Sequence, residues 1–348
     1  MPETSITARK LAALEKMGFE RVDLSPVTTD AVRLDRKTFK VTSTRPAMGT
    51  LVSISALARS RERAEEAIGR ALEEMDRLIG VFSRFEGASA ITTLNDAGRL
   101  DDSPPEFSHV LSRSIEYHAL SSGAFDVTVE PLVELFRGRL DAITPREPSS
   151  VEIMEALELV GSRNVVLSPR GVRFAREGMG VTLDGVAKGY IVDAMGRVLA
   201  DRGIGSYLIN AGGDIRAGGL KEKRRPWTVA VQDPSKSGSF PDTIHLTDAA
   251  VATSGSYEIY FDRDRMYHHI VSSKTGMSPN LSAGVSVVAP SAMAADALAT
   301  GVFVMEPERG IELIDSLSGC ECLIIGEDGT QLKSRGWRSA RNHDTDID

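Results

Sequence analysis

The chain has 348 residues, of which 41% are hydrophobic and 26% charged, and its formal net charge is −8. This length predicts about two domains or one large domain, and the apolar content is sufficient for a packed core. The negative charge excludes a nucleic-acid binder that relies on a general basic field. The two cysteines, Cys320 and Cys322, are too few for a disulfide framework and lack the companions of a zinc site. No apolar run reaches the roughly 18 residues that span a bilayer.

In chain order, residues 1–41 are polar and indicate an N-terminal extension. A turn running into a strand is expected over 42–56, and apolar residues at helical spacing predict helices over 61–80, 106–121 and 145–161. Another helix ends at Gly203, and two more cover 291–306 and 307–317. Short strands are expected at 164–167, 171–174, 181–183, 206–210, 227–232, 243–246, 250–253, 266–271, 284–289, 321–325 and 330–333. Residues 336–348 form a polar tail. This mixture favours an α+β fold with mixed or antiparallel sheets flanked by helices.

The stretch 291–306 is almost entirely apolar and is expected to be a buried helix. Between Ser291 and Met305 its one charged residue is Asp296, and Thr300 follows one turn later on the same face. A buried carboxylate needs a cation or a proton. A carboxylate beside a hydroxyl is a hard-oxygen pair that suits Mg²⁺ or Ca²⁺. The alternative is a core helix whose aspartate only hydrogen-bonds a neighbouring loop.

Two glycine-containing segments lie where strands are expected to end. The segment Asp184–Gly189 (DGVAKG) precedes a helix, so its backbone amides and Lys188 could hold a phosphate. The alternative is an ordinary strand–helix turn with an exposed lysine. The segment Asn210–Asp214 (NAGGD) has a glycine pair that permits close approach of the backbone to a ligand, or simply a tight turn.

Two adjacent histidines, His268 and His269, fall within an expected strand. Neighbouring side chains on a strand point to opposite faces, so at most one of the two enters a given site. His268 is expected to point outward. His269 is the candidate general base, with a core histidine as the alternative.

Seven blocks in a fixed order make these separate signals more specific. They are MGT near residue 48, SSGAFDVTVEPLVELF at 121–136, LDGVAKGYIVD at 183–193, INAGGDIRAGG at 209–219, VATSGSY at 251–257, HHIVSSKTGMSP at 268–279 and SVVAPSAMAADALATGVFVM at 286–305. Together they resemble the ApbE family, the FAD:protein FMN transferases, over about residues 43–333. The resemblance implies the T-fold-like ApbE architecture, with an FAD-binding transferase domain over 42–335.

The resemblance also implies an enzyme that uses FAD as substrate and requires Mg²⁺. Such an enzyme transfers the FMN part of FAD onto a Thr or Ser hydroxyl of a partner flavoprotein through a phosphoester bond and releases AMP. Asp296, Thr300 and the backbone carbonyl of Gly185 would bind the metal, and His269 and Asp296 would act in catalysis. The FAD pocket would contain Met48, Phe85, Ala124, Phe125, Asp126, Thr182, Lys188, His269, Ile270 and Thr275, with 210–214 along the same cleft.

The chain departs from the family pattern at three places. Thr182 stands where many members have an aspartate that contacts the flavin, and Asp184 follows two residues later. Ser272 and Ser273 replace a common Asp-Pro pair. Ser256 stands where Asp or Asn is common. These differences affect the expected turnover, adenine-side binding and partner choice more than the expected fold.

Two further functions would use the same pocket. One is an FAD pyrophosphatase, which passes FMN to water, and the other is a non-catalytic FAD-binding or flavin-delivery protein. The N-terminal residues have neither the apolar core of a signal peptide nor a lipoprotein cysteine, so the sequence as written predicts a cytoplasmic protein. A misassigned or trimmed N-terminus would leave a periplasmic location open.

Overall fold

The computed structural model describes residues 28–140, 146–234, 240–255, 268 and 270–340. The strands are β1 (Thr28–Arg33), β2 (Phe39–Ala47), β3 (Thr50–Ala58), β4 (Arg99–Asp101), β5 (Val165–Ser168), β6 (Gly171–Phe174), β7 (Tyr207–Ala211), β8 (Asp214–Gly218), β9 (Trp227–Ala230), β10 (Thr243–Leu246), β11 (Ala250–Gly255), β12 (Gly284–Ala289), β13 (Glu321–Ile325) and β14 (Gln331–Lys333). The helices are α2 (Arg61–Phe82), α3 (Ala90–Ala97), α4 (Pro105–Leu120), α5 (Glu130–Leu140), α6 (Ser150–Leu157), α7 (Ala187–Asp201), α8 (Ala292–Val304) and α9 (Pro307–Asp315), with short 3₁₀ turns η1 (Val127–Val129), η2 (Ser162–Asn164) and η3 (Glu222–Arg224).

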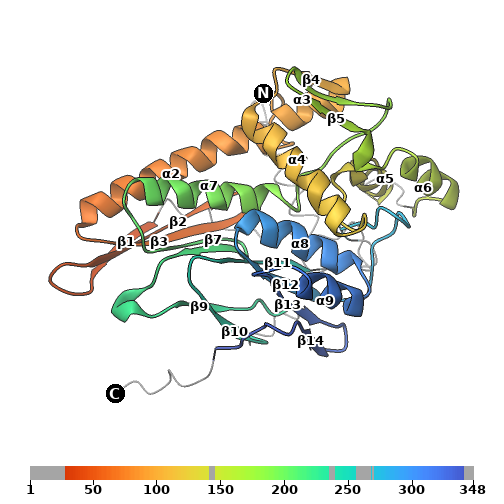
Figure 1. The fold of residues 1–348 in the computed structure, drawn as a ribbon. Coiled ribbons are helices and arrows are strands. Elements are labelled where there is room, and N and C mark those ends of the chain that lie inside the picture. The colour runs from red at the N-terminus through yellow and green to blue at the C-terminus, as the bar shows by residue number, and fades with distance from the viewer. Residues whose placement is uncertain (1–27, 141–145, 235–239, 256–267, 269, 341–348) are drawn as a thin grey trace, which may run out of the picture.

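The main sheet has nine strands in the order β1-β2-β3-β7-β8-β11-β12-β13-β14, and every neighbouring pair is antiparallel. The helices α2, α7 and α8 cover one face of this sheet, and the ribbon of β9 and β10 lies against the other (Figure 1). The small sheet β4-β6-β5 and α3 to α6 gather at one end of the helical layer (Figure 1). The structure thus confirms the predicted α+β class with antiparallel sheets.

Alternation along the strands explains how the sheet separates two cores. In β13, Cys322 and Ile324 pack into the core beneath the helices, whereas Leu323 and Ile325 pack toward β9 and β10. The helical layer is held by apolar spacing of the same kind. In α2 the buried residues recur at three- and four-residue intervals, and its N-cap Ser60 accepts a hydrogen bond from the Arg63 amide.

The predicted helices over 61–80, 106–121, 291–306 and 307–317 correspond to α2, α4, α8 and α9. Helices α3 and α5 and strands β4 and β8 had no counterpart in the prediction. The expected strand at 181–183 is wrong, because this segment is irregular. Its backbone pairs with a side chain: the amide and carbonyl of Val181 both bond Asn95, at 2.8 and 2.9 Å.

The ordered structure extends beyond both predicted domain boundaries. Strand β1 lies within residues 1–41 and pairs along its whole length with β2. At the other end, Trp337 is buried and its indole Nε1 donates to Asp242 at 2.9 Å. The residues next to the expected domain 42–335 therefore pack on it. None of the helices in the described part of the chain is long and apolar enough to cross a membrane.

Candidate functional site

The helices α7 and α8 cap each other where their N-terminal ends meet. Asp193 of α7 accepts hydrogen bonds from the amides of Ala292 and Met293, both at 2.9 Å. Asp296 of α8 accepts from the Gly189 amide at 3.1 Å. Both aspartates are buried. Because the first amides of a helix have no partner within it, each carboxylate satisfies donors of the other helix. This exchange fixes the relative positions of the two helices.

The predicted metal ligands lie together at this junction. Gly185 is in the turn before α7, and a Cβ built on it would lie 2.7 Å from the Oγ1 of Thr300. A side chain at position 185 would therefore collide with Thr300, so the close approach requires glycine. Asp296 lies one turn before Thr300 on α8. The carboxylate, the hydroxyl and the backbone carbonyl are all oxygen donors, which fits the ligand preference of Mg²⁺.

This donor set has a single carboxylate. Among the described residues no group of three or more His, Cys, Asp or Glu side chains is arranged to hold a metal ion. The Oγ1 of Thr300 also lies 3.3 Å from the Oγ of Ser254 on β11. The sheet therefore supports the hydroxyl that faces Gly185.

Lys188 connects the glycine-containing blocks at 184–189 and 210–214. Its ammonium lies 3.0 Å from the Oδ2 of Asp214, which is 3% exposed. The register of β3 and β7 pairs Val52 with Ala211, so the MGT turn after Met48 lies beside the NAGGD block. Lys188 is therefore ion-paired rather than freely exposed. Contact of Lys188 and Met48 with FAD stays a prediction.

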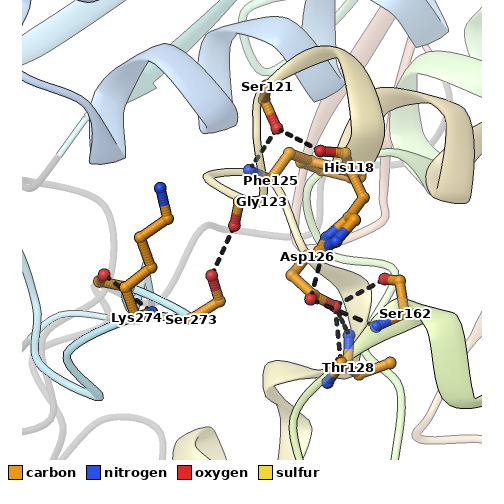
Figure 2. Close-up of polar contacts among 11 residues, drawn as sticks. His118, Ser121, Gly123, Phe125, Asp126, Thr128, Ser162, Ser273 and Lys274 are labelled. Carbon is orange, nitrogen blue, oxygen red and sulfur yellow. Dashed lines mark hydrogen bonds and ion pairs between the residues drawn. The ribbon is translucent and has the colours of Figure 1, made fainter.

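A turn over residues 121–126, which holds Phe125 and Asp126, follows α4 (Figure 2). The Oδ1 of Asp126 accepts from the amide and hydroxyl of Thr128 at 2.8 and 2.6 Å and from the Ser162 hydroxyl at 2.7 Å. Its Oδ2 lies 3.0 Å from the Nδ1 of His118. The Asp126 carboxylate is thus engaged with the scaffold, and the hydrogen bonds from His118, Thr128 and Ser162 hold its pKa below the usual range despite burial.

His118, in the last turn of α4, did not figure in the sequence prediction. The carboxylate of Asp126 raises the pKa of the imidazole, because it stabilises the protonated ring. A histidine at a helix end shortly before a Gly-Ala-Phe-Asp turn was the signal available in the sequence.

The turn 121–126 contacts both α8 and the segment 270–277. A Cβ on Gly301, the residue after Thr300, would lie 3.2 Å from the Cβ of Phe125. The Ser273 hydroxyl donates to the Gly123 carbonyl at 2.5 Å (Figure 2). The amide of Thr275 donates to Ser272 at 3.3 Å. These contacts link the turn that holds Ala124 and Phe125, and the segment that holds Thr275, to the helix that carries Asp296 and Thr300. Ile270 is buried in the main core.

The prediction for the histidine pair is partly corrected. His268 is fully buried rather than outward-facing. Its Nε2 lies 2.9 Å from the Pro279 carbonyl, its ring contacts Phe303 edge-on, and burial lowers its pKa. Only the choice of His268 as the outward residue is wrong, and residues 270 and 271, expected in the same strand, are irregular. His269 and Ser256 lie outside the described residues, as does much of the expected strand 266–271.

Phe85 and Thr182 are linked through charged residues. The Phe85 ring is 82% exposed, with the Arg84 guanidinium 5.2 Å from its centre. Arg84 in turn lies 3.0 Å from the Oδ2 of Asp184, whose amide donates to the Thr182 hydroxyl at 3.3 Å. An exposed aromatic ring beside a cation is suited to stacking on a planar ligand.

Glu130, the first residue of α5, is a buried acid that the sequence did not lead us to predict. Its Oε2 lies 3.9 Å from Arg84, a loose contact. Burial raises the pKa of this carboxyl to about 8, although Arg84 opposes the shift. An acidic residue inside the apolar run VTVEPLV was the same type of signal that identified Asp296.

Comparisons with known proteins identify the family of this chain. The model of the ApbE family matches residues 48–324. An FAD:protein FMN transferase of Vibrio cholerae is 30% identical over 78% of this chain and 83% of its own length, and one of Treponema pallidum is 31% identical over 83% and 85%. The crystal structure of the ApbE protein of Thermotoga maritima superposes with a TM-score of 0.76 at 30% identity, covering 88% of this chain and 97% of that one. The chain belongs to the ApbE family.

Proposed function

We propose that this protein is a Mg²⁺-dependent FAD:protein FMN transferase. It moves FMN from FAD onto a Thr or Ser hydroxyl of a partner flavoprotein, forms a phosphoester bond and releases AMP. The observation that carries the proposal is the junction of α7 and α8, where Gly185 lies against Thr300 one turn from the buried Asp296. The relatives named for this activity support it. We assign the transferase domain to residues 42–335 together with β1 and Trp337, which pack on it.

The carboxylate of Asp296, the hydroxyl of Thr300 and the carbonyl of Gly185 would hold the Mg²⁺. When bound, the ion offsets negative charge on diphosphate oxygens. Asp296 supplies the only formal charge of this donor set, so it dominates the affinity. Thr300 supplies a neutral donor, and its loss is expected to weaken the site less than loss of Asp296.

In the transfer, the acceptor hydroxyl oxygen forms a bond to the phosphorus of the FMN part of FAD. The bond from that phosphorus to the bridging oxygen breaks, and AMP leaves with this oxygen. His269 takes the hydroxyl proton and passes it to solvent. Phe125 and Ile270, whose side chains are buried, would line the site and exclude water, which favours the protein hydroxyl over hydrolysis.

The test is to incubate the purified protein with FAD and Mg²⁺, with and without a candidate acceptor flavoprotein. AMP release and ultraviolet fluorescence of the acceptor band are measured together. AMP release only with acceptor, abolished by EDTA, supports the transferase. AMP release without acceptor would instead establish a pyrophosphatase, and bound FAD with no AMP would establish a carrier. Asp296→Asn is the matched inactive control, because it keeps an acceptor for the Gly189 amide.

A further inference from the structure

Two basic side chains from distant parts of the chain, His118 and Lys274, flank the turn at Gly123. A Cβ built on Gly123 would lie 3.5 Å from the Cε1 of His118 and 3.8 Å from the Cε of Lys274. Gly123 has a φ of +87°, in the left-handed region that favours glycine, so no side chain stands between the two groups. Figure 2 shows both residues around this turn.

The scaffold holds both groups in place. Asp126, whose side chain is 1% exposed, fixes the imidazole of His118 through its contact with Nδ1. The hydroxyl of Ser273, next to Lys274, is bonded to the Gly123 carbonyl. Asp126 balances one positive charge, and Lys274 adds another, so the turn carries net positive charge when His118 is protonated. Asp126 raises the pKa of His118, whereas Lys274 lowers it.

We propose that His118 and Lys274 form a clamp that binds the diphosphate of FAD. The proposal rests on the proposed function and identifies two positioning residues for its substrate. The isoalloxazine and adenine rings of FAD are uncharged at neutral pH, and the diphosphate is its anionic part. Charge-assisted hydrogen bonds from imidazolium and ammonium groups suit phosphate oxygens. The turn also touches α8 at Gly301, beside the Thr300 of the predicted metal site, so one diphosphate could meet both.

The test compares ligands with and without the diphosphate. Dissociation constants for FAD, ADP and riboflavin are measured at low and high salt for wild type, His118→Gln and Lys274→Gln. Each variant is expected to weaken binding of FAD and ADP about 10-fold at low salt, typical of a lost charge-assisted hydrogen bond, and less at high salt. Riboflavin, which lacks phosphate, should bind all three proteins equally. Lys274→Arg should retain FAD affinity.

The controls are His109→Gln, an exposed histidine on the same helix, and Lys37→Gln, an exposed lysine elsewhere. Both should bind FAD as the wild type does. Unchanged FAD affinity in both clamp variants would overturn the clamp. So would an equal loss of riboflavin affinity, because that would indicate a loosened turn rather than a lost phosphate contact. If wild type transfers FMN and both clamp variants bind FAD as tightly as wild type does, only the clamp proposal is overturned. A wild type that binds no FAD would overturn the proposed function as well.

Discussion

The two faces of the nine-stranded sheet have cores of different chemistry. The core beneath β9 and β10 consists of aliphatic and tryptophan side chains: Ile215, Ala217, Trp227, Val229, Val231, Ile244, Leu246, Val251, Leu323, Ile325 and Trp337. The face covered by α7 and α8 also has a large apolar core, but it buries Asp193, Asp214 and Asp296 as well. Buried carboxylates cost stability unless they are paired or bound to a cation.

The helical face thus contains buried charges that cost stability, and one of them lies at the candidate site. Of the three aspartates, Asp193 satisfies helix amides and Asp214 pairs with Lys188, which are structural tasks. Asp296 both caps α7 and lies beside the Gly185–Thr300 contact. If the two faces of the sheet differ in this way, substitutions on the β9–β10 side change only the free energy of unfolding, and those on the helical side change activity.

The largest effect is expected at Asp296. Asp296→Asn should lower Mg²⁺-dependent AMP release by about 10³-fold or more, because it removes the charged metal ligand, worth several kcal/mol in the transition state. Asp296→Ala should add about 1–3 kcal/mol of lost stability, since the Gly189 amide is left without its acceptor. Activity assays across Mg²⁺ concentrations and thermal unfolding measure the two effects. Wild-type activity in Asp296→Asn would contradict the metal assignment.

The opposite face is tested at Leu323, which is fully buried in β13. Leu323→Ala should lower the free energy of unfolding by about 2–5 kcal/mol through the cavity it leaves. At temperatures where the variant is folded, kcat/KM for FAD should equal that of wild type. Leu332→Ala, on the neighbouring β14 and 39% exposed, is the control with little stability loss. A fall in kcat/KM for the folded Leu323 variant would break the comparison.

Variants of Lys188 distinguish a structural ion pair from a contact with the ligand. Lys188→Ala should weaken FAD binding by about 1–3 kcal/mol in a salt-sensitive manner, as expected for a hydrogen bond to a charged group. It should also destabilise the protein, because the buried Asp214 loses its ion pair. Adding Asp214→Asn should recover stability but not affinity. Recovery of FAD affinity in the double variant would show that Lys188 only neutralises Asp214.

The smallest effect is a pH dependence at Glu130. Its folded pKa of about 8 lies above its ordinary value of 4.5, so the stability contributed by the neutral form is present below about pH 4.5 and is lost as pH rises through 8. Glu130→Gln has no carboxyl group to ionise, so its free energy of unfolding should exceed that of wild type by about 1–3 kcal/mol between pH 5 and 9. Urea unfolding at several pH values measures it. The exposed Glu155→Gln should show no such trend.

The apolar run and the start signals at 290–291 were enough to predict α8, and the four-residue spacing of Asp296 and Thr300 was enough to place them on a shared face. The third predicted ligand, Gly185, came from the family resemblance, since no local rule brings a turn to a helix more than 100 residues later. The irregular segment around Val181 was mistaken for a strand because its partner, the Asn95 side chain, is equally remote in sequence.

The pairing of His118 with Asp126 was missed for a related reason. The two residues are close in sequence, but they meet only because the turn at Gly123 adopts a positive φ and reverses the chain. Helix α5 was missed because Pro131 is its second residue, and a proline ordinarily ends a helix. It is tolerated here because it lies in the first turn of the helix. Strand β1, with one partly buried residue among six, offers no apolar alternation to detect.

The order of the strands has a consequence for how the molecule folds. Strands β3 and β7 are neighbours, with Val52 opposite Ala211, yet the chain between them contains α2 to α7. Closing so long a loop delays the central pairing, so the high contact order predicts slow folding. A nascent chain that has not yet reached β7 leaves β3 with an open edge. His118, at the end of α4, and Gly185, in the turn before α7, both lie in this intervening segment, so the substrate site takes shape only when the sheet closes.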